Sequence, residues 1–146
     1  NLPELSTEIQ EQFREVIKNY LQLKNDLVND HAGASKNSAQ KALTQLQAIT
    51  TSEEETSVKI SSLKEGFSNI SKADEIETQR EYFISLSEEI ISISKQIETS
   101  QKLFVQKCPM ANNNQGAKWL SLEEEIKNPY YGASMLGCGS VIDVIN

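Results

Sequence analysis

The chain has 146 residues, a length that fits one domain with a single hydrophobic core. Its formal net charge of −7 argues against nucleic-acid binding, which needs a clustered basic surface. Aromatic residues make up only 6% of the chain, which favours helices over a β-sandwich, and no apolar run approaches the roughly 18 residues needed to span a membrane.

Four segments with helical periodicity come first in the chain. Apolar residues recur at intervals of three and four within about 3–29, 34–50, 52–70 and 73–99. Pro3 suits the first turn of the first helix, and Ser52 with Glu55 fits a capping box that would open the third. Because short connections place consecutive helices antiparallel, we expect an all-α protein with an up-down-up-down four-helix bundle over residues 1–99.

Residues 100–146 have a different character. Leu103-Phe104-Val105 is a short apolar run that we expect to be extended, and Asn112–Asn114 are expected to form a turn. One helical turn is expected at Ser121–Lys127, where Ser121 and Glu124 fit a second capping box. We therefore expect a single domain over residues 1–146, with a loop-rich tail packed on the bundle.

The tail holds all four sulfur-containing side chains, those of Cys108, Met110, Met135 and Cys138. Thiolate and thioether ligands select copper(I) or silver over harder ions, so these four residues predict a soft-metal site. The alternative is a disulfide between the two cysteines, which would form readily in an exported protein, with the methionines as core residues. Both interpretations require the cysteines to be adjacent, with Cα atoms within about 7 Å if they are bridged.

Zinc is disfavoured at this site because it rarely takes thioether ligands and the chain has one histidine, His31. His31 is expected in the turn between the first two helices, and we leave it out of the ligand set. Trp119, Tyr130 and Tyr131 are expected to anchor the tail on the bundle through buried area, or to shield a copper(I) site. The sequence lacks a Gly-rich phosphate loop and the histidine patterns of metalloproteases and haem attachment, so we do not expect an enzyme.

Four motifs of the tail resemble a bacterial family of exported domains of unknown function. The motifs are CPMA at 108–111, NNNQGAKWLS at 112–121, EIKNPYYG at 125–132 and MLGCG at 135–139. The family pattern is approximately YCPMA, NNKGAxWLS, EIxNPYFG and MLxCG, so Tyr131 stands where the family usually has Phe. Residues 79–87 are also similar, whereas the first three helices agree only in hydrophobic pattern. The specific resemblance therefore covers about the last 70 residues.

The resembled family occurs alone or joined to periplasmic adaptor subunits of heavy-metal (copper/silver) efflux pumps. The resemblance thus implies a periplasmic or otherwise exported protein. The chain begins at Asn1 without a methionine or a signal peptide, which fits a mature exported protein or a shortened chain. We expect a copper(I)-binding module for heavy-metal handling or efflux, whose partners are the metal ion and an efflux adaptor or another periplasmic protein. The alternative is a structural or interaction domain whose tail is closed by a Cys108–Cys138 disulfide.

Overall fold

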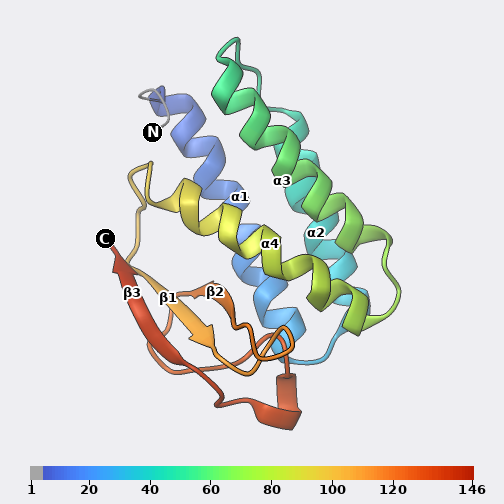
Figure 1. Cartoon of the computed structure of the whole chain (residues 1–146). Helices are drawn as coiled ribbons and strands as arrows, with labels where there is room; N and C mark the ends of the chain where they lie inside the picture. The colour runs from blue at the N-terminus through green and yellow to red at the C-terminus, as the bar shows by residue number, and fades with distance from the viewer. Residues whose placement is uncertain (1–4) are drawn as a thin grey trace.

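The computed structural model describes residues 5–146 and consists of four helices followed by a three-stranded antiparallel sheet (Figure 1). The helices are α1 (Thr7–Val28), α2 (Ala32–Gln47), α3 (Glu54–Lys72) and α4 (Ile76–Ser94). The strands are β1 (Leu103–Cys108), β2 (Ala117–Ser121) and β3 (Ser140–Ile145), and the 3₁₀ helix η1 (Gly132–Met135) precedes β3. The four predicted helices are confirmed, but the all-α class is wrong, because the tail forms a sheet and the protein is mixed α/β.

Several predicted helix ends differ from the structure. The first helix is capped by Ser6, whose Oγ accepts a hydrogen bond from the amide of Ile9 at 3.2 Å. The prediction that this helix begins near Pro3 lies outside the described residues. The capping box predicted at Ser52 is not formed: the N-cap of α3 is Glu53, whose amide donates to Thr51 Oγ1 at 3.1 Å.

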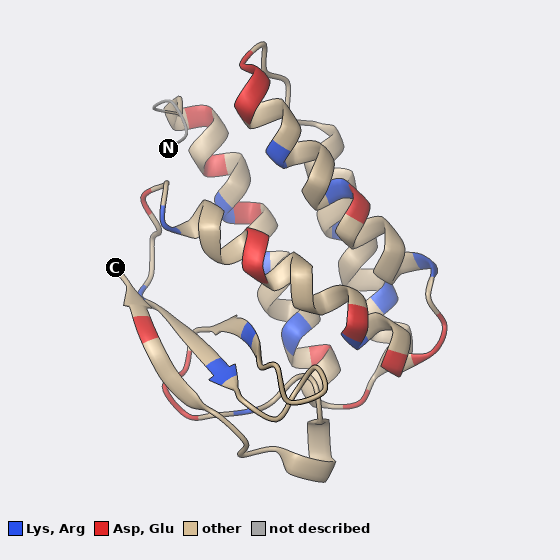
Figure 2. Ribbon diagram, viewed as in Figure 1, with Lys and Arg blue, Asp and Glu red and all other residues tan. Residues whose placement is uncertain are grey.

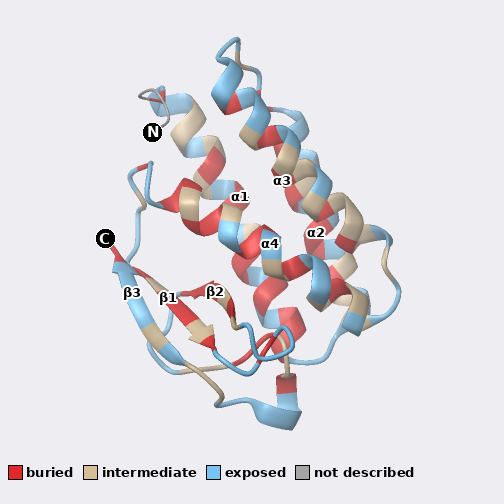
Figure 3. Ribbon diagram, in the orientation of Figure 1, coloured by how far each residue is buried: buried red, intermediate tan, exposed pale blue. Residues whose placement is uncertain are grey.

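Consecutive helices pack against one another, and their inward faces carry the buried side chains (Figures 1 and 3). The largest of these come from α1, α3 and α4, including Phe13, Tyr20, Phe67 and Phe83, all of which are fully buried. Lys and Arg side chains are scattered over all four helices (Figure 2). The helices therefore form a common apolar core beneath a mixed polar surface.

The sheet has the order β2-β1-β3, with β1 in the centre. Val105 pairs with Leu120 and Cys108 with Ala117, while a register irregularity between Val105 and Gln106 interrupts the pairing with β3. Strands β1 and β2 are largely buried, whereas β3 is mostly exposed (Figure 3). The segment 122–139 carries the chain from β2 at one edge of the sheet to β3 at the other.

Two tyrosine hydroxyls cover the outer edge of β2. Tyr20 Oη accepts a hydrogen bond from the amide of Leu120 at 3.2 Å, and Tyr130 Oη donates to the carbonyl of Lys118 at 2.7 Å. An uncovered edge would leave backbone groups free to pair with another chain. Tyr20 lies on α1, so these bonds also fix the sheet on the helices.

The expectations for the tail are partly confirmed. Leu103–Val105 are extended and form the first half of β1, and Asn112–Asn114 lie in a turn with φ of 57°, 54° and 66°. Asparagine tolerates this left-handed region better than most residues. The helical turn predicted at Ser121–Lys127 is wrong. Ser121 ends β2, and its Oγ accepts a hydrogen bond from the amide of Glu123 at 3.0 Å, which closes a short turn instead.

Candidate functional site

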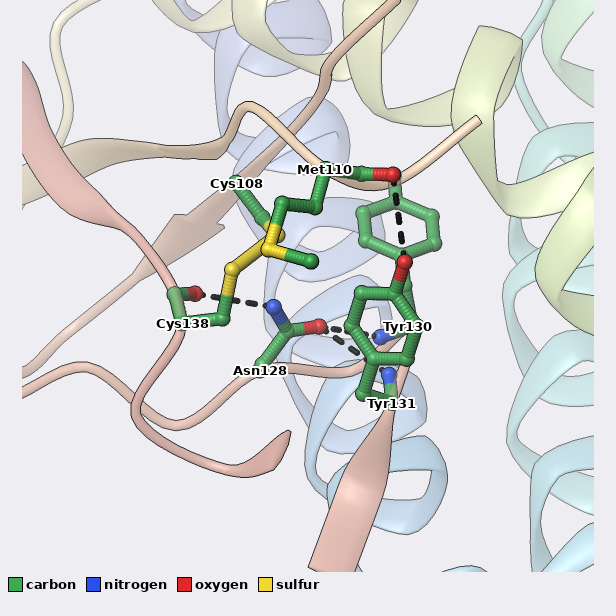
Figure 4. The surroundings of a disulfide bond; sticks show 6 residues. All are labelled: Cys108, Met110, Asn128, Tyr130, Tyr131 and Cys138. Carbon is green, nitrogen blue, oxygen red and sulfur yellow. Dashed lines mark hydrogen bonds between the residues drawn. A yellow bond between two sulfur atoms is a disulfide. The ribbon is translucent and has the colours of Figure 1, made fainter. Parts of the chain in front are cut away.

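The structure joins Cys108 and Cys138 in a disulfide, with their Cα atoms 5.6 Å apart (Figure 4). Cys108 ends β1 and is fully buried, while Cys138 follows η1 and is only partly buried. The prediction that the two cysteines are adjacent is therefore confirmed. In the disulfide neither sulfur is a thiolate, which is the form that binds metal.

Both methionines lie between the two cysteines in the sequence, and both are exposed. Met110 is 48% exposed and Met135 is 36% exposed, so the expectation of methionines in the core is wrong. Figure 4 shows the Met110 side chain directed toward the disulfide. Within residues 5–146 no group of three or more His, Cys, Asp or Glu side chains could hold a metal ion. Metal binding by Cys108, Met110, Met135 and Cys138 remains a prediction.

Asn128 organises the segment that carries Cys138. Its buried side chain donates from Nδ2 to the carbonyl of Cys138 at 2.8 Å and accepts from the amides of Tyr130 and Tyr131 at 2.7 and 3.1 Å. Its own amide donates to the carbonyl of Leu136 at 2.8 Å. These bonds satisfy a buried amide group that would otherwise be costly. Sequence reasoning missed this role, although an Asn before Pro is a signal for such a turn.

A chain of aromatic contacts links the tail to the helices. Tyr20 stacks on Phe83 with ring centroids 5.0 Å apart, Phe83 lies 5.7 Å from Tyr130, and Tyr130 lies 6.0 Å from Trp119. Trp119 is fully buried, and its Nε1 donates to Gln106 Oε1 at 2.8 Å. Burial raises the pKa of Tyr20 and of Tyr130 well above the usual range, so both hydroxyls stay protonated. The expectation that Trp119 and Tyr130 anchor the tail agrees with these contacts.

Arg80 connects α4 with the α1–α2 turn and with the tail. Its Nε donates to the carbonyl of Pro129 at 2.7 Å, and its Nη2 donates to the carbonyl of Leu27 and to Asp30 Oδ1, each at 2.7 Å. The other carboxylate oxygen of Asp30 accepts a hydrogen bond from the amide of Ala133 at 3.2 Å. Residues 79–87 and the segment 125–132 are thus in direct contact.

Gly132 packs closely against the ion pair between Arg80 and Asp30. It has φ of +56°, and a Cβ at this position would overlap the Asp30 carboxylate and lie 2.7 Å from Arg80 Nη2. We expect Gly132→Ala to lower the free energy of unfolding by about 2 kcal/mol, because the left-handed conformation alone costs alanine about 1–2 kcal/mol. Denaturant unfolding would measure this. Gly137→Ala is the matched control, since a Cβ there meets open space, and equal effects of the two substitutions would contradict the prediction.

The Arg80–Asp30 pair predicts a pH dependence. Hydrogen bonds from the Arg80 guanidinium and the Ala133 amide hold the pKa of Asp30 below its usual value. The ionised carboxylate therefore stabilises the folded protein above its ordinary pKa of about 3.9, and this stabilisation is lost as the pH falls through the lowered value. The Asp30 side chain is 44% exposed, so we expect at most about 1 kcal/mol.

The corresponding measurement is the free energy of unfolding between neutral and strongly acidic pH for Asp30→Asn and the unsubstituted protein. The difference between the two profiles should shrink toward acid, where the native carboxylate becomes protonated. Profiles that stay parallel through the acidic range would show that the pair contributes no pH-dependent stability.

Lys24 is a buried basic residue at the contact between α1 and the end of β2. It is 1% exposed, and its Nζ lies 3.3 Å from Ser121 Oγ and 3.4 Å from Asn25 Oδ1. Burial lowers the pKa of Lys24, while nearby Glu123 acts in the opposite direction. Because Ser121 is fully buried as well, this pair has no access to a substrate and serves to hold β2 on α1.

His31 is exposed in the α1–α2 turn, as expected, and the tail reaches this turn through Ala133.

An open groove of about 750 Å³ lies between α1 and the connection from α4 to β1. Its rim includes Arg14, Lys18 and Glu98, and therefore charges of both signs, which select no particular ion.

Four helices, an antiparallel sheet and one disulfide define a small α/β domain whose C-terminal part is covalently closed onto the sheet. A sequence profile for a family described as a protein of unknown function (DUF3347) matches residues 16–102, which is more than half of the chain. The chain belongs to this family, which confirms the expected membership in a domain-of-unknown-function family. The match covers most of α1 and all of α2–α4, and it ends just before β1, so the tail motifs lie outside it. No curated protein and no solved structure matches the chain.

Proposed function

We propose that this protein is an exported interaction domain whose disulfide holds an apolar surface in place for a protein partner. The observation that carries the proposal is the Cys108–Cys138 disulfide, with exposed apolar side chains on both sides of it. Disulfides persist in oxidising compartments such as the periplasm and are rare in the cytosol. None of the helices in residues 5–146 has the length and apolar character needed to cross a membrane.

The surface in question consists of Met110, Met135 and Leu136, and we call it the methionine surface. These side chains are 48%, 36% and 41% exposed. Met110 is two residues from Cys108 and Met135 is three from Cys138, so the disulfide brings their two turns together. Methionine is flexible and polarizable, which suits an apolar surface that must adapt to a partner.

The proposed partner is a periplasmic adaptor subunit of a heavy-metal efflux pump, and the proposed source is bacterial. This part of the proposal rests on the resemblance of the motifs at 108–139 to domains found joined to such adaptors. In this role the protein is a binding module rather than an enzyme.

Binding to a purified adaptor subunit, measured by calorimetry, tests the proposal. We expect a triple variant with Met110→Glu, Met135→Glu and Leu136→Glu to weaken binding at least tenfold. Val58→Glu is the matched control, because Val58 is an exposed apolar residue, 61% exposed, on α3. Equal affinity of the triple variant and the unsubstituted protein would exclude the methionine surface. Two reactive thiols in protein isolated without reductant would contradict the disulfide-closed form.

A second candidate function is copper(I) binding by the reduced protein. It is favoured by the 5.6 Å between the two cysteine Cα atoms, with one exposed methionine beside each cysteine. After reduction, Cys108 and Cys138 would supply two thiolates, and Met110 and Met135 two thioethers, a ligand set suited to copper(I) or silver.

Anaerobic titration of the reduced protein with copper(I), followed at the thiolate-to-copper ultraviolet band, tests this second function. Met110→Ala and Met135→Ala should each weaken binding, while Leu136→Ala, which removes an exposed side chain without a sulfur, should not. Affinity no tighter than micromolar, or affinity unaffected by both methionine substitutions, would exclude the site.

A further inference from the structure

The two cysteines of the disulfide differ in how far they are buried. Cys108 is 0% exposed and belongs to the hydrophobic core together with its strand partner Ala117 and with Ala111 and Trp119. Cys138 is only partly buried at the edge of that core. An incoming reagent can therefore reach one side of the bond far more easily than the other.

The backbone beside Cys138 is also open. A Cβ placed on Gly137 would meet no atom within 4 Å, and the preceding Leu136 is 41% exposed. On the β1 side, Cys108 is itself fully buried at the end of the central strand, where it pairs with Ala117 of β2. The open backbone at Gly137 and the partial burial of Cys138 thus both favour attack on the Cys138 sulfur.

We propose that Cys138 is a thiol-exchange site, at which a small thiol attacks the disulfide and becomes attached to the protein. The attacking thiolate forms a bond to Cys138 Sγ, the bond between the two cysteine sulfurs breaks, and Cys108 leaves as a thiolate that takes up a proton. With a dithiol, the second thiol then attacks the mixed disulfide, frees the Cys138 thiol and is itself oxidised to a disulfide, so that two electrons pass to the protein. This reactivity does not depend on either function proposed above.

The same geometry makes the exchange slow. The leaving thiolate of Cys108 is released into apolar surroundings, where a charged sulfur is poorly stabilised. Exchange slows when the leaving thiolate is poorly stabilised. Attack on Cys108 would release the better solvated Cys138 thiolate, but the nucleophile cannot reach the buried sulfur. The bond therefore opens from one side only, and more slowly than the same bond in the unfolded chain.

Brief treatment of the native protein with glutathione, followed by acid quenching, pepsin digestion and mass spectrometry, locates the adduct. We expect at least tenfold more glutathione on Cys138 than on Cys108. The control is the same reaction in guanidinium chloride, where both sulfurs are accessible and the adducts should be nearly equal. Native adducts in equal amounts, or mostly on Cys108, would overturn the proposal. So would a native protein that forms no adduct under conditions in which the unfolded chain reacts.

Single-cysteine variants provide an independent measurement. Cys108→Ser leaves the Cys138 thiol and Cys138→Ser leaves the Cys108 thiol, and circular dichroism shows whether each variant is folded. In the folded variants, 5,5′-dithiobis(2-nitrobenzoate) should react at least tenfold faster with Cys138 than with Cys108. Equal rates in folded variants would overturn the proposal. If either variant does not fold, the adduct map of the native protein decides alone.

Discussion

Replacement of Trp119 by alanine is expected to lower the free energy of unfolding by about 3–5 kcal/mol, the usual cost of removing a buried aromatic side chain. Trp119 is fully buried in β2, makes an edge contact with Tyr130, and donates from Nε1 to Gln106 Oε1 at 2.8 Å. The substitution would leave a cavity and also remove the partner of a buried amide oxygen. Equilibrium unfolding in guanidinium chloride measures the change.

Trp119→Phe separates these two contributions. Phenylalanine keeps much of the apolar volume but cannot donate a hydrogen bond to Gln106, so we expect a smaller loss of about 1–3 kcal/mol. Tyr82→Ala serves as an exposed aromatic control, because Tyr82 on α4 is 40% exposed. If Trp119→Ala cost no more than Tyr82→Ala, the tail would not be anchored through this residue.

Loss of the disulfide is expected to lower the free energy of unfolding by about 3–4 kcal/mol. The bridge joins Cys108 and Cys138, which are 30 positions apart in the sequence, and a cross-link of this span restricts the unfolded chain by that amount in the loop-closure treatment. The double variant Cys108→Ala, Cys138→Ala removes the bridge without leaving free thiols. Its unfolding should be compared with that of the oxidised protein and of the protein reduced with a dithiol.

The double variant and the reduced protein should be destabilised by similar amounts, because both lose the same cross-link. The fold should survive in each, since Asn128 and Arg80 still hold the tail through hydrogen bonds to Cys138, Tyr130 and Pro129. A loss below about 1 kcal/mol would contradict the loop-closure treatment for this bridge.

The Trp119 substitutions and the removal of the disulfide both test the tail, which lies beyond the family match. Residues 16–102, which match the family profile, carry most of α1 and all of α2–α4, whereas Trp119 and both cysteines lie in the tail. The tail motifs directly contact Arg80 and Phe83 of α4 and Tyr20 and Lys24 of α1. The helices therefore provide the surface on which the tail is built, and the candidate site lies in the tail itself.

The four helices and the adjacency of the two cysteines could be predicted from the sequence alone. Helices arise from local hydrogen bonds and from apolar residues repeated every three or four positions, so their presence can be read from a short window. The helix ends do not follow from this pattern: it predicts the fourth helix over 73–99, whereas the helix spans Ile76–Ser94. The pairing of Cys108 with Cys138 was one of two interpretations that both required the sulfurs to meet.

The sheet and the contacts within the tail could not be predicted from the sequence, because they depend on residues that are far apart in the chain. Strand β1 pairs with residues up to 42 positions away, as in the pair formed by Leu103 and Ile145, and such non-local bonds leave little trace in a local pattern. The same holds for Asn128, which the sequence presents as one turn residue and the structure presents as a buried hydrogen-bonding centre. The exposure of Met110 and Met135 depends on how two distant turns pack, because an apolar side chain carries no local signal that distinguishes the surface from the core.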